Sequence, residues 1–201
     1  LPDEIRVAIL DMLAKHRSMW RGRLGQVQST NHRIDLIPGQ NPVHCQPYRA
    51  GPTARAVESA ERERMLKAEV IEPATSEWAS PIVLVAKPDG STRFCVDYRR
   101  LNSITVRDSY PLPRMDECID SLGDAKIFTT LDCNSGYWQI PVRPEDREKT
   151  TFTSHEGLYW FLRMPFGLRN APATFQRFVD ITLSGLTWKT CLVYLDDIIV
   201  F

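Results

Sequence analysis

Three aspartates beside apolar segments are the residues best suited to chemistry. Asp196 and Asp197 lie between the apolar runs CLVYL and IIVF, and Asp132 follows the apolar segment 127–131. Apolar arms around an acidic pair predict a β-hairpin with a polar tip. If the fold brings both sites together, their carboxylates could bind two divalent cations, which activate a hydroxyl and stabilise a departing phosphate oxygen. The alternative is that Asp196-Asp197 forms a solvated turn, which these residues favour.

The segments that must position these acids are of two kinds. Short apolar runs between turn residues predict strands at 82–85, 92–96, 127–131, 150–153, 158–162, 191–194 and 198–201. Helical patterns cover 3–20, 54–70 and 115–122, and Asn170 can cap a further helix with Pro172 in its first turn. Residues 21–53 are predicted to form a long connector with one strand-like run at 33–37. Helices and strands without βαβ regularity indicate an α+β fold.

Composition excludes few classes but reveals a local imbalance. The 201 residues carry 25 basic and 25 acidic side chains, so net charge gives no sign of a nucleic-acid partner. Segment 84–107 nevertheless has a basic surplus: Lys87, Arg93, Arg99, Arg100 and Arg107 against Asp89 and Asp97. The sequence lacks a long apolar run and a basic leader, and its five cysteines contain no CxxC pair. We therefore expect an intracellular protein with reduced thiols, no membrane span and no zinc site.

Ordered motifs over residues 32–201 carry a resemblance to a known family. They are SEWASPIVLVAKPDGSTRFCVDYRRLN, SYPLPRMDECIDSL, LDCNSGYWQI, MPFGLRNAPATFQ and VYLDDIIVF. Together they resemble the reverse transcriptase of gypsy-type LTR retrotransposons. The resemblance implies right-hand polymerase fingers and a partial palm, with an antiparallel palm sheet, packed helices and no thumb. Residues 1–31 would be a helix and linker after a protease, 32–125 mainly fingers leading into the palm, and 126–201 palm with a returning fingers hairpin near 143–163.

The same resemblance implies two-metal nucleotidyl transfer. Asp132, Asp196 and Asp197 would be the catalytic carboxylates. Asp132 and Asp196, with the backbone carbonyl of Cys133, would hold two Mg²⁺ ions, for which Mn²⁺ could substitute. A primer 3′-hydroxyl would attack the α-phosphate of a deoxynucleoside triphosphate, where metals and cations stabilise the developing charge.

Further residues are implied to bind nucleotide or nucleic acid. The nucleotide-binding set is Lys87 and Arg93 at the triphosphate, Ser135 and Gly136 through backbone N–H groups, Tyr137 as a block to a 2′-hydroxyl, and Phe166 with Gly167 packed on the nucleotide. The template or primer set is Gln139, Gln176 and Tyr194. Structural alternatives remain open for these residues: a solvated basic turn at Lys87 and Arg93, a core tyrosine at Tyr137, and a helix start with packing around Phe166.

The implied partners are an RNA or DNA template with its primer, deoxynucleoside triphosphates, and the other parts of a Pol polyprotein: protease, thumb, ribonuclease H and integrase. The implied location is a cytoplasmic virus-like particle or the nucleus, without membrane contact. One alternative is a truncated or domesticated relic that binds nucleic acid without catalysis. Another is a related right-hand polymerase, such as a group II intron or RNA-dependent RNA polymerase, against which MPFGLRNAPATFQ and Tyr137 argue.

Overall fold

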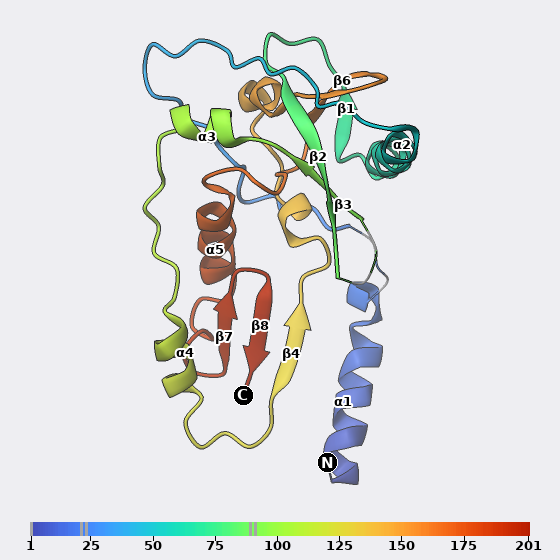
Figure 1. Cartoon of the computed structure of the whole chain (residues 1–201). Coiled ribbons are helices and arrows are strands. Elements are labelled where there is room, and N and C mark those ends of the chain that lie inside the picture. Colours follow the sequence, from blue (N-terminus) through green and yellow to red (C-terminus); the bar gives the residue numbers. More distant parts are fainter. Residues whose placement is uncertain (1, 21, 23, 89, 91) are drawn as a thin grey trace.

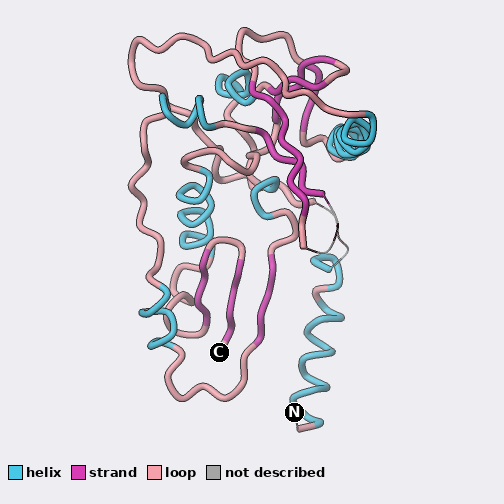
Figure 2. Tube along the Cα trace, in the orientation of Figure 1, coloured by secondary structure: helices cyan, strands magenta, loops and turns pink. Residues whose placement is uncertain are grey.

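Two β-sheets, one above the other in Figure 1, organise the chain. The computed structural model describes residues 2–20, 22, 24–88, 90 and 92–201. Its helices are α1 (Asp3–Lys15), α2 (Pro52–Lys67), α3 (Arg99–Ile104), α4 (Met115–Ser121) and α5 (Ala171–Thr182), with 3-10 turns at Arg17–Trp20, Gly136–Gln139 and Pro144–Thr150. Its strands are β1 (Ile71–Pro73), β2 (Ser80–Ala86), β3 (Thr92–Val96), β4 (Thr129–Asp132), β5 (Phe152–Ser154), β6 (Gly157–Phe161), β7 (Cys191–Tyr194) and β8 (Asp197–Val200). Long loops connect many of these elements (Figure 2).

The upper sheet contains five strands in the order β1-β6-β5-β2-β3. Neighbouring strands are antiparallel except β2 and β5, which run parallel. The predicted hairpins at 82–96 and 150–162 are both present, as β2–β3 and β5–β6. Asp89, predicted to lie in the turn of the first hairpin, is outside the described residues.

The lower sheet contains three antiparallel strands in the order β4-β8-β7. Tyr194 pairs with Asp197, so Leu195 and Asp196 form a two-residue turn between β7 and β8. This confirms the acidic hairpin with apolar arms. The predicted strand before Asp132 is also present, but it is shifted so that Asp132 is the last residue of β4. Helix α5 packs on β7, one arm of this hairpin.

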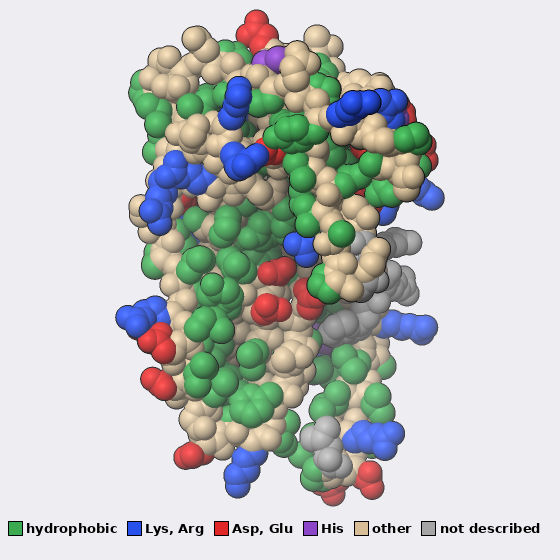
Figure 3. Space-filling model, viewed as in Figure 1, with side chains coloured by type: hydrophobic (Ala, Val, Ile, Leu, Met, Phe, Trp, Pro, Cys, Tyr) green, Lys and Arg blue, Asp and Glu red, His purple; other side chains and the backbone are tan. Residues whose placement is uncertain are grey.

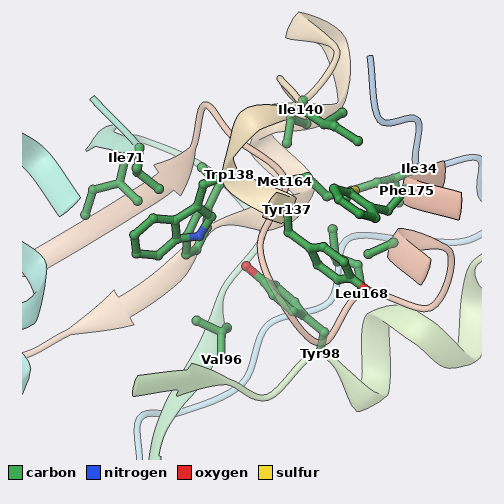
Figure 4. Close-up of a cluster of buried hydrophobic side chains, with 14 of the residues drawn as sticks. Ile34, Ile71, Val96, Tyr98, Tyr137, Trp138, Ile140, Met164, Leu168 and Phe175 are labelled. Atoms are coloured by element: carbon green, nitrogen blue, oxygen red, sulfur yellow. The ribbon is translucent and has the colours of Figure 1, made fainter. Parts of the chain in front are cut away.

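One core of buried side chains joins the region of the upper sheet to α5 and β7. Figure 4 shows Tyr137 in this core among Phe175, Leu168 and Tyr98, with Trp138 directed toward Ile71. Because apolar burial contributes about 25 cal/mol per Å², these large side chains hold the turn Gly136–Gln139 firmly in place. Only residues 133–135 separate that turn from β4, so the core also restrains the end of the strand that carries Asp132.

Helix α2 ends earlier than the predicted 54–70 because its last turn closes in a Schellman motif. The N–H of Val70 donates to the Met65 carbonyl at 2.9 Å, and that of Glu69 donates to the Leu66 carbonyl at 3.1 Å. Glu69 has a φ of 54°, in the position where glycine is usual. Val70 and Met65 are both buried, which supplies the apolar contact typical of the motif. The chain then enters β1, a strand that the sequence pattern did not predict.

Other differences from the predicted elements arise from tertiary contacts. The run 33–37 forms no strand; instead His32 and Leu36 make single bridges to Val142 and Thr105. Asn170 precedes α5 as predicted, but its side chain does not cap the helix. Its Nδ2 donates to the Val106 carbonyl at 2.7 Å, and its Oδ1 accepts from the Asp108 N–H at 3.0 Å. The side chain thus satisfies backbone groups of the segment 106–108, which runs beside the start of α5.

The predicted helix 3–20 divides into α1 and the 3-10 turn Arg17–Trp20. No residue of α1 is buried, although its sequence is amphipathic. Residues 21 and 23 of the predicted connector lie outside the described residues. Across the ranges that the structure describes, none of the helices has the length and apolar character needed to cross a membrane.

Candidate functional site

The three predicted catalytic aspartates meet at one end of the lower sheet. Asp132 is the register partner of Asp197 across β4 and β8. Asp196 occupies the adjoining turn, and its carbonyl accepts a hydrogen bond from the Cys133 N–H at 3.2 Å. Figure 3 shows acidic side chains gathered in the middle of this face, at the level where Figure 1 draws the end of β4 beside the β7–β8 turn. Asp132 and Asp197, 65 positions apart in sequence, are thus adjacent because antiparallel pairing places them opposite each other.

The turn that carries Asp196 is held by a buried glutamine. Leu195 has a φ of 57°, a left-handed conformation that costs a non-glycine residue stability. Its N–H donates to Gln176 Oε1 at 2.9 Å, and Gln176 Nε2 donates to the Val193 carbonyl at 3.3 Å. Gln176 has no exposed surface. The predicted contact of Gln176 with template or primer does not fit this burial; its side chain instead fixes the acidic turn.

The charges of the three carboxylates reach the neighbouring side chains. Burial raises the pKa of the Cys133 thiol, and the negative charges of Asp196, Asp132 and Asp197 raise it further. Burial also raises the pKa of Tyr137 to about 12, with Asp196 adding to the effect. Both shifts have the sign expected when an anion forms near existing anions. Cys133 and Tyr137 are therefore neutral near pH 7 beside the acids.

The donor set suits a cation that arrives with its own ligands. Asp132 and Asp197 are exposed and Asp196 is partly exposed. The Cys133 carbonyl accepts a hydrogen bond from the Gly136 N–H at 3.1 Å and retains a second lone pair. Within the described residues, no three His, Cys, Asp or Glu side chains form a group able to hold a metal ion by themselves. Mg²⁺ usually takes one or two carboxylates and completes its shell with water and substrate phosphates, so these oxygens fit such an ion.

Tyr137 lies beside the acids between two aromatic rings. It stacks on Phe166 with ring centroids 4.8 Å apart and an interplanar angle of 18°. On the same ring Phe175 packs at 5.3 Å. Tyr137 is 7% exposed whereas Phe166 is 51% exposed, so Phe166 forms the outer layer of the stack. Tyr137 is therefore a core residue, as the alternative interpretation of its motif predicted. A contact of Tyr137 with the nucleotide sugar stays a prediction.

Gly136 is required by the packing of this stack. A Cβ at this position would lie 2.8 Å from Phe175 Cζ and 3.1 Å from Cys133 Cβ. Phe175 is buried and has little room to move. The Gly136 N–H, predicted to face a triphosphate, already donates to the Cys133 carbonyl. Ser135, the other residue of this prediction, adopts a φ of 49° and starts the 3-10 turn.

The two predicted phosphate-binding cations lie on the β2–β3 hairpin. Lys87 follows the last residue of β2, and Arg93 is paired with Val85 on β3. Both side chains are exposed. Figure 3 shows blue atoms of Lys or Arg side chains next to the acidic group on this face. The structure thus places both predicted cations, exposed, on the β2–β3 hairpin.

The remaining predicted residues differ in accessibility. Gln139 Nε2 donates to the Asn134 carbonyl at 3.0 Å, so its amide supports the loop after β4. Tyr194 is partly buried at the end of β7, opposite Asp197. Gly167 has a φ of 90° in the loop after Phe166, a conformation that favours glycine. Contacts of these three residues with nucleotide, template or primer stay predictions.

The chain resembles retrotransposon polyproteins in sequence. It is 43% identical over 167 residues to the Retrovirus-related Pol polyprotein from transposon opus of Drosophila melanogaster, covering 81% of this chain and 17% of the polyprotein. It is also 43% identical over 169 residues to the corresponding polyprotein from transposon gypsy, covering 80% of this chain and 16% of that protein. This chain therefore spans about a sixth of the length of these relatives.

Solved structures agree with the predicted fold. The prototype foamy virus protease-reverse transcriptase matches with a TM-score of 0.84 and 27% identity, over all of this chain and 27% of that chain. The foamy viral protease-reverse transcriptase dRH in complex with double-stranded DNA matches with a TM-score of 0.89 and 25% identity, over all of this chain and 36% of that chain. These matches confirm the α+β fold of polymerase fingers and palm.

The segment that contains the three aspartates matches a known protein family. The model described as Reverse transcriptase (RNA-dependent DNA polymerase) matches residues 85–201, more than half of the chain. The matched segment contains Asp132, Asp196 and Asp197, which the structure brings together. The relatives confirm the resemblance to gypsy-type Pol polyproteins. The chain belongs to the reverse transcriptase (RNA-dependent DNA polymerase) family.

Proposed function

We propose that this chain provides the catalytic centre of an RNA-directed DNA polymerase that extends a primer by two-metal nucleotidyl transfer. The observation that carries the proposal is the register pairing of Asp132 with Asp197, which brings Asp196 of the adjoining turn to the end of β4. Antiparallel pairing makes this arrangement of carboxylates part of the fold. The family match supports the reaction class.

Asp132, Asp196 and the Cys133 carbonyl are the proposed ligands of two Mg²⁺ ions, with Mn²⁺ as a substitute. When bound, such ions lower the pKa of a hydroxyl and stabilise charge on phosphate oxygens. Asp197 adds negative charge beside these ligands. Asp197, the register partner of Asp132 at the start of β8, would support these ligands through its charge.

The other residues would bind and select the nucleotide. Lys87 and Arg93 offer a point charge and a fork of N–H donors to the triphosphate oxygens. Tyr137, held between Phe166 and Phe175, would exclude a 2′-hydroxyl sterically. Ser135 and Gly167 lie on loops that bound this space. The proposed partners are a template with primer, deoxynucleoside triphosphates and the other parts of a Pol polyprotein.

The domain limits follow from the same assignment. Residues 32–125 would be mainly fingers and 126–201 mainly palm, with 1–31 as a helix and linker. The parallel pair β2–β5 attaches the hairpin β5–β6, late in sequence, to β2. This pairing supports the proposed return of residues 143–163 to the fingers.

Primer extension tests the proposal. The 201-residue chain is assayed alone and joined at Phe201 to the segment that follows in the opus polyprotein. We expect Mg²⁺-dependent incorporation that falls at least about 100-fold in Asp132→Asn and Asp196→Asn, because removal of electrostatic stabilisation typically costs this much. Asp124→Asn is the matched control, since Asp124 is exposed in the loop before β4.

Two outcomes contradict the proposal. Extension at the wild-type rate in Asp132→Asn or Asp196→Asn shows that these carboxylates are not catalytic. Salt-dependent binding of primer–template without incorporation by either form supports a relic that binds nucleic acid only.

A further inference from the structure

The side-chain amide of Asn102 connects helix α3 to the loop of residues 166–169. Its Nδ2 donates to the Gly167 carbonyl at 2.8 Å, and its Oδ1 accepts from the Arg169 N–H at 2.8 Å. One asparagine thus satisfies a backbone acceptor and a backbone donor of the same loop, using both functions of its amide. The planar amide of Asn102 thus holds the loop at two points, Gly167 and Arg169, which are two residues apart.

Arg169 makes the return connection to α3. Its Nη1 donates to the carbonyls of Asn102 and Thr105 at 3.0 and 3.1 Å. These carbonyls lie at the C-terminal end of α3, where a cation is favourable. The Asn102 carbonyl also accepts from the Thr105 N–H at 3.4 Å. The helix and the loop therefore hold each other through two side chains that act in opposite directions.

The loop carries the outer ring of the stack beside the acids. Phe166 packs parallel to Tyr137 and is 51% exposed, so its own burial restrains it only in part. Gly167 follows with a φ of 90°, and its would-be Cβ lies 3.4 Å from the Val96 carbonyl. The backbone that directs Phe166 onto Tyr137 thus has an unusual conformation close to the upper sheet. The bonds from Asn102 hold it there.

We infer that Asn102 is a positioning residue for selection of the nucleotide sugar. By holding Gly167 and Arg169, Asn102 keeps Phe166 stacked on Tyr137. This stacking fixes the orientation of the Tyr137 ring, which contacts the sugar. The inference rests on the proposed function, in which Tyr137 contacts the sugar. Asn102 lies on α3, within the proposed fingers. A residue of the fingers thus contributes to the sugar selectivity of Tyr137 in the proposed palm.

Three variants test this role. Asn102→Ala removes both bonds to the loop, and Asn102→Asp keeps an acceptor for Arg169 but repels the Gly167 carbonyl. Ser103→Ala is the matched control on the same helix. Among the residues that the structure describes, the Ser103 hydroxyl donates only to the Arg100 carbonyl of α3, at 2.7 Å. The measurements are hydrogen exchange of residues 164–170, and kcat and KM for dTTP and UTP in primer extension.

We expect the Arg169 amide of Asn102→Ala to exchange about tenfold faster than in the wild type, as an opened loop loses protection. The KM for dTTP should rise about tenfold while kcat changes less than about threefold, because nucleotide positioning is lost and the carboxylates remain. The preference for dTTP over UTP should fall about fivefold. Asn102→Asp should change KM and sugar preference in the same way, but its exchange should rise at amides near Gly167 rather than at Arg169, whose acceptor remains. Ser103→Ala should match the wild type.

Unchanged exchange and unchanged sugar preference in a folded Asn102 variant, judged by circular dichroism, overturn the inference. If Asn102→Ala does not fold, Asn102→Asp decides in the same way. Hydrogen exchange needs no catalysis, so the two proposals fail separately. Absence of extension by both wild-type forms, the chain alone and the joined chain, overturns the proposed function. Normal extension with wild-type KM and sugar preference in the variants overturns only the role of Asn102.

Discussion

The Oε1 atom of Gln176 on α5 accepts a hydrogen bond from the Leu195 N–H at 2.9 Å, one residue before Asp196. Gln176 also donates to the Val193 carbonyl, so one buried amide holds the backbone on the β7 side of the acidic turn. The turn includes a left-handed leucine, which needs such support. The geometry of the acidic turn thus depends on a helix that contributes none of the proposed metal ligands.

Replacement of Gln176 by Met should weaken the site without removing a carboxylate. Met has a similar length but offers neither bond, leaving the Leu195 N–H and the Val193 carbonyl without their partner. We expect kcat in primer extension to fall about 10- to 100-fold, since small misplacement of catalytic groups costs this much. The unfolding free energy should fall by about 1–3 kcal/mol. Denaturant titration and single-turnover extension measure the two effects.

The exposed Gln28 supplies the control for this change. Gln28→Met should keep the wild-type stability and rate. Retention of the wild-type kcat by Gln176→Met would show that the turn does not need the glutamine.

Replacement of Tyr137 separates its packing role from its proposed steric role. Tyr137→Ala should raise the use of ribonucleotides relative to deoxyribonucleotides about tenfold or more, because the ring that blocks a 2′-hydroxyl is gone. The same change should cost about 3–5 kcal/mol of stability, since it leaves a cavity between Phe166 and Phe175. Competition between UTP and dTTP in primer extension gives the selectivity.

Tyr137→Phe keeps the ring and removes only the hydroxyl. It should therefore retain the sugar selectivity of the wild type. Equal selectivity in the wild type and Tyr137→Ala would exclude the steric role and leave Tyr137 as a packing residue.

The buried His32 should make folding sensitive to mild acid. His32 is 1% exposed, and its Nδ1 lies 2.9 Å from Thr174 Oγ1. Burial lowers the pKa of His32 from 6.5 to about 4, although the charges of Asp146, Asp108 and Asp35 act to raise it. The folded state therefore favours neutral His32, while the unfolded chain binds a proton near pH 6.5. The contribution of neutral His32 to the unfolding free energy is therefore fully present above pH 6.5. It is lost as the pH falls toward 4.

The expected loss between pH 7.5 and pH 4.5 is about 2–3 kcal/mol of unfolding free energy from this residue. Denaturant titration at a series of pH values measures it. His32→Gln has no titrating group and should lack this part of the slope, whatever its overall stability. Equal slopes in the wild type and His32→Gln would contradict the assignment.

The sequence predicted the elements that depend on local patterns. Alternating apolar runs and turn residues are local features, so the hairpins β2–β3, β5–β6 and β7–β8 could all be predicted. The shared order of motifs identified the three aspartates as one site. Their actual meeting depends on the pairing of β4 with β8, a contact between segments far apart in the sequence.

The parts that could not be predicted depend on long-range hydrogen bonds. Gln176 lies in a predicted helix and Asn102 in a segment for which the sequence predicted no helix or strand, and only the fold shows which loops they hold. Asn170 looked like a helix cap, yet its amide bonds the passing segment 106–108. The end of α2 at Lys67 was missed because Glu69 occupies a position where glycine is the usual signal.

Iron(II)-directed cleavage tests the central claim, that Asp132 and Asp196 together form a divalent-cation site. Fe²⁺ takes oxygen ligands like Mg²⁺, and with peroxide and ascorbate it cleaves the backbone beside its binding site. With dTTP present, we predict cleavage concentrated near residues 132 and 196, competed by Mg²⁺, reduced about tenfold in Asp132→Asn and unchanged in Asp124→Asn. Cleavage that is absent from both strand ends, or that is equal in Asp132→Asn and the wild type, would contradict the account.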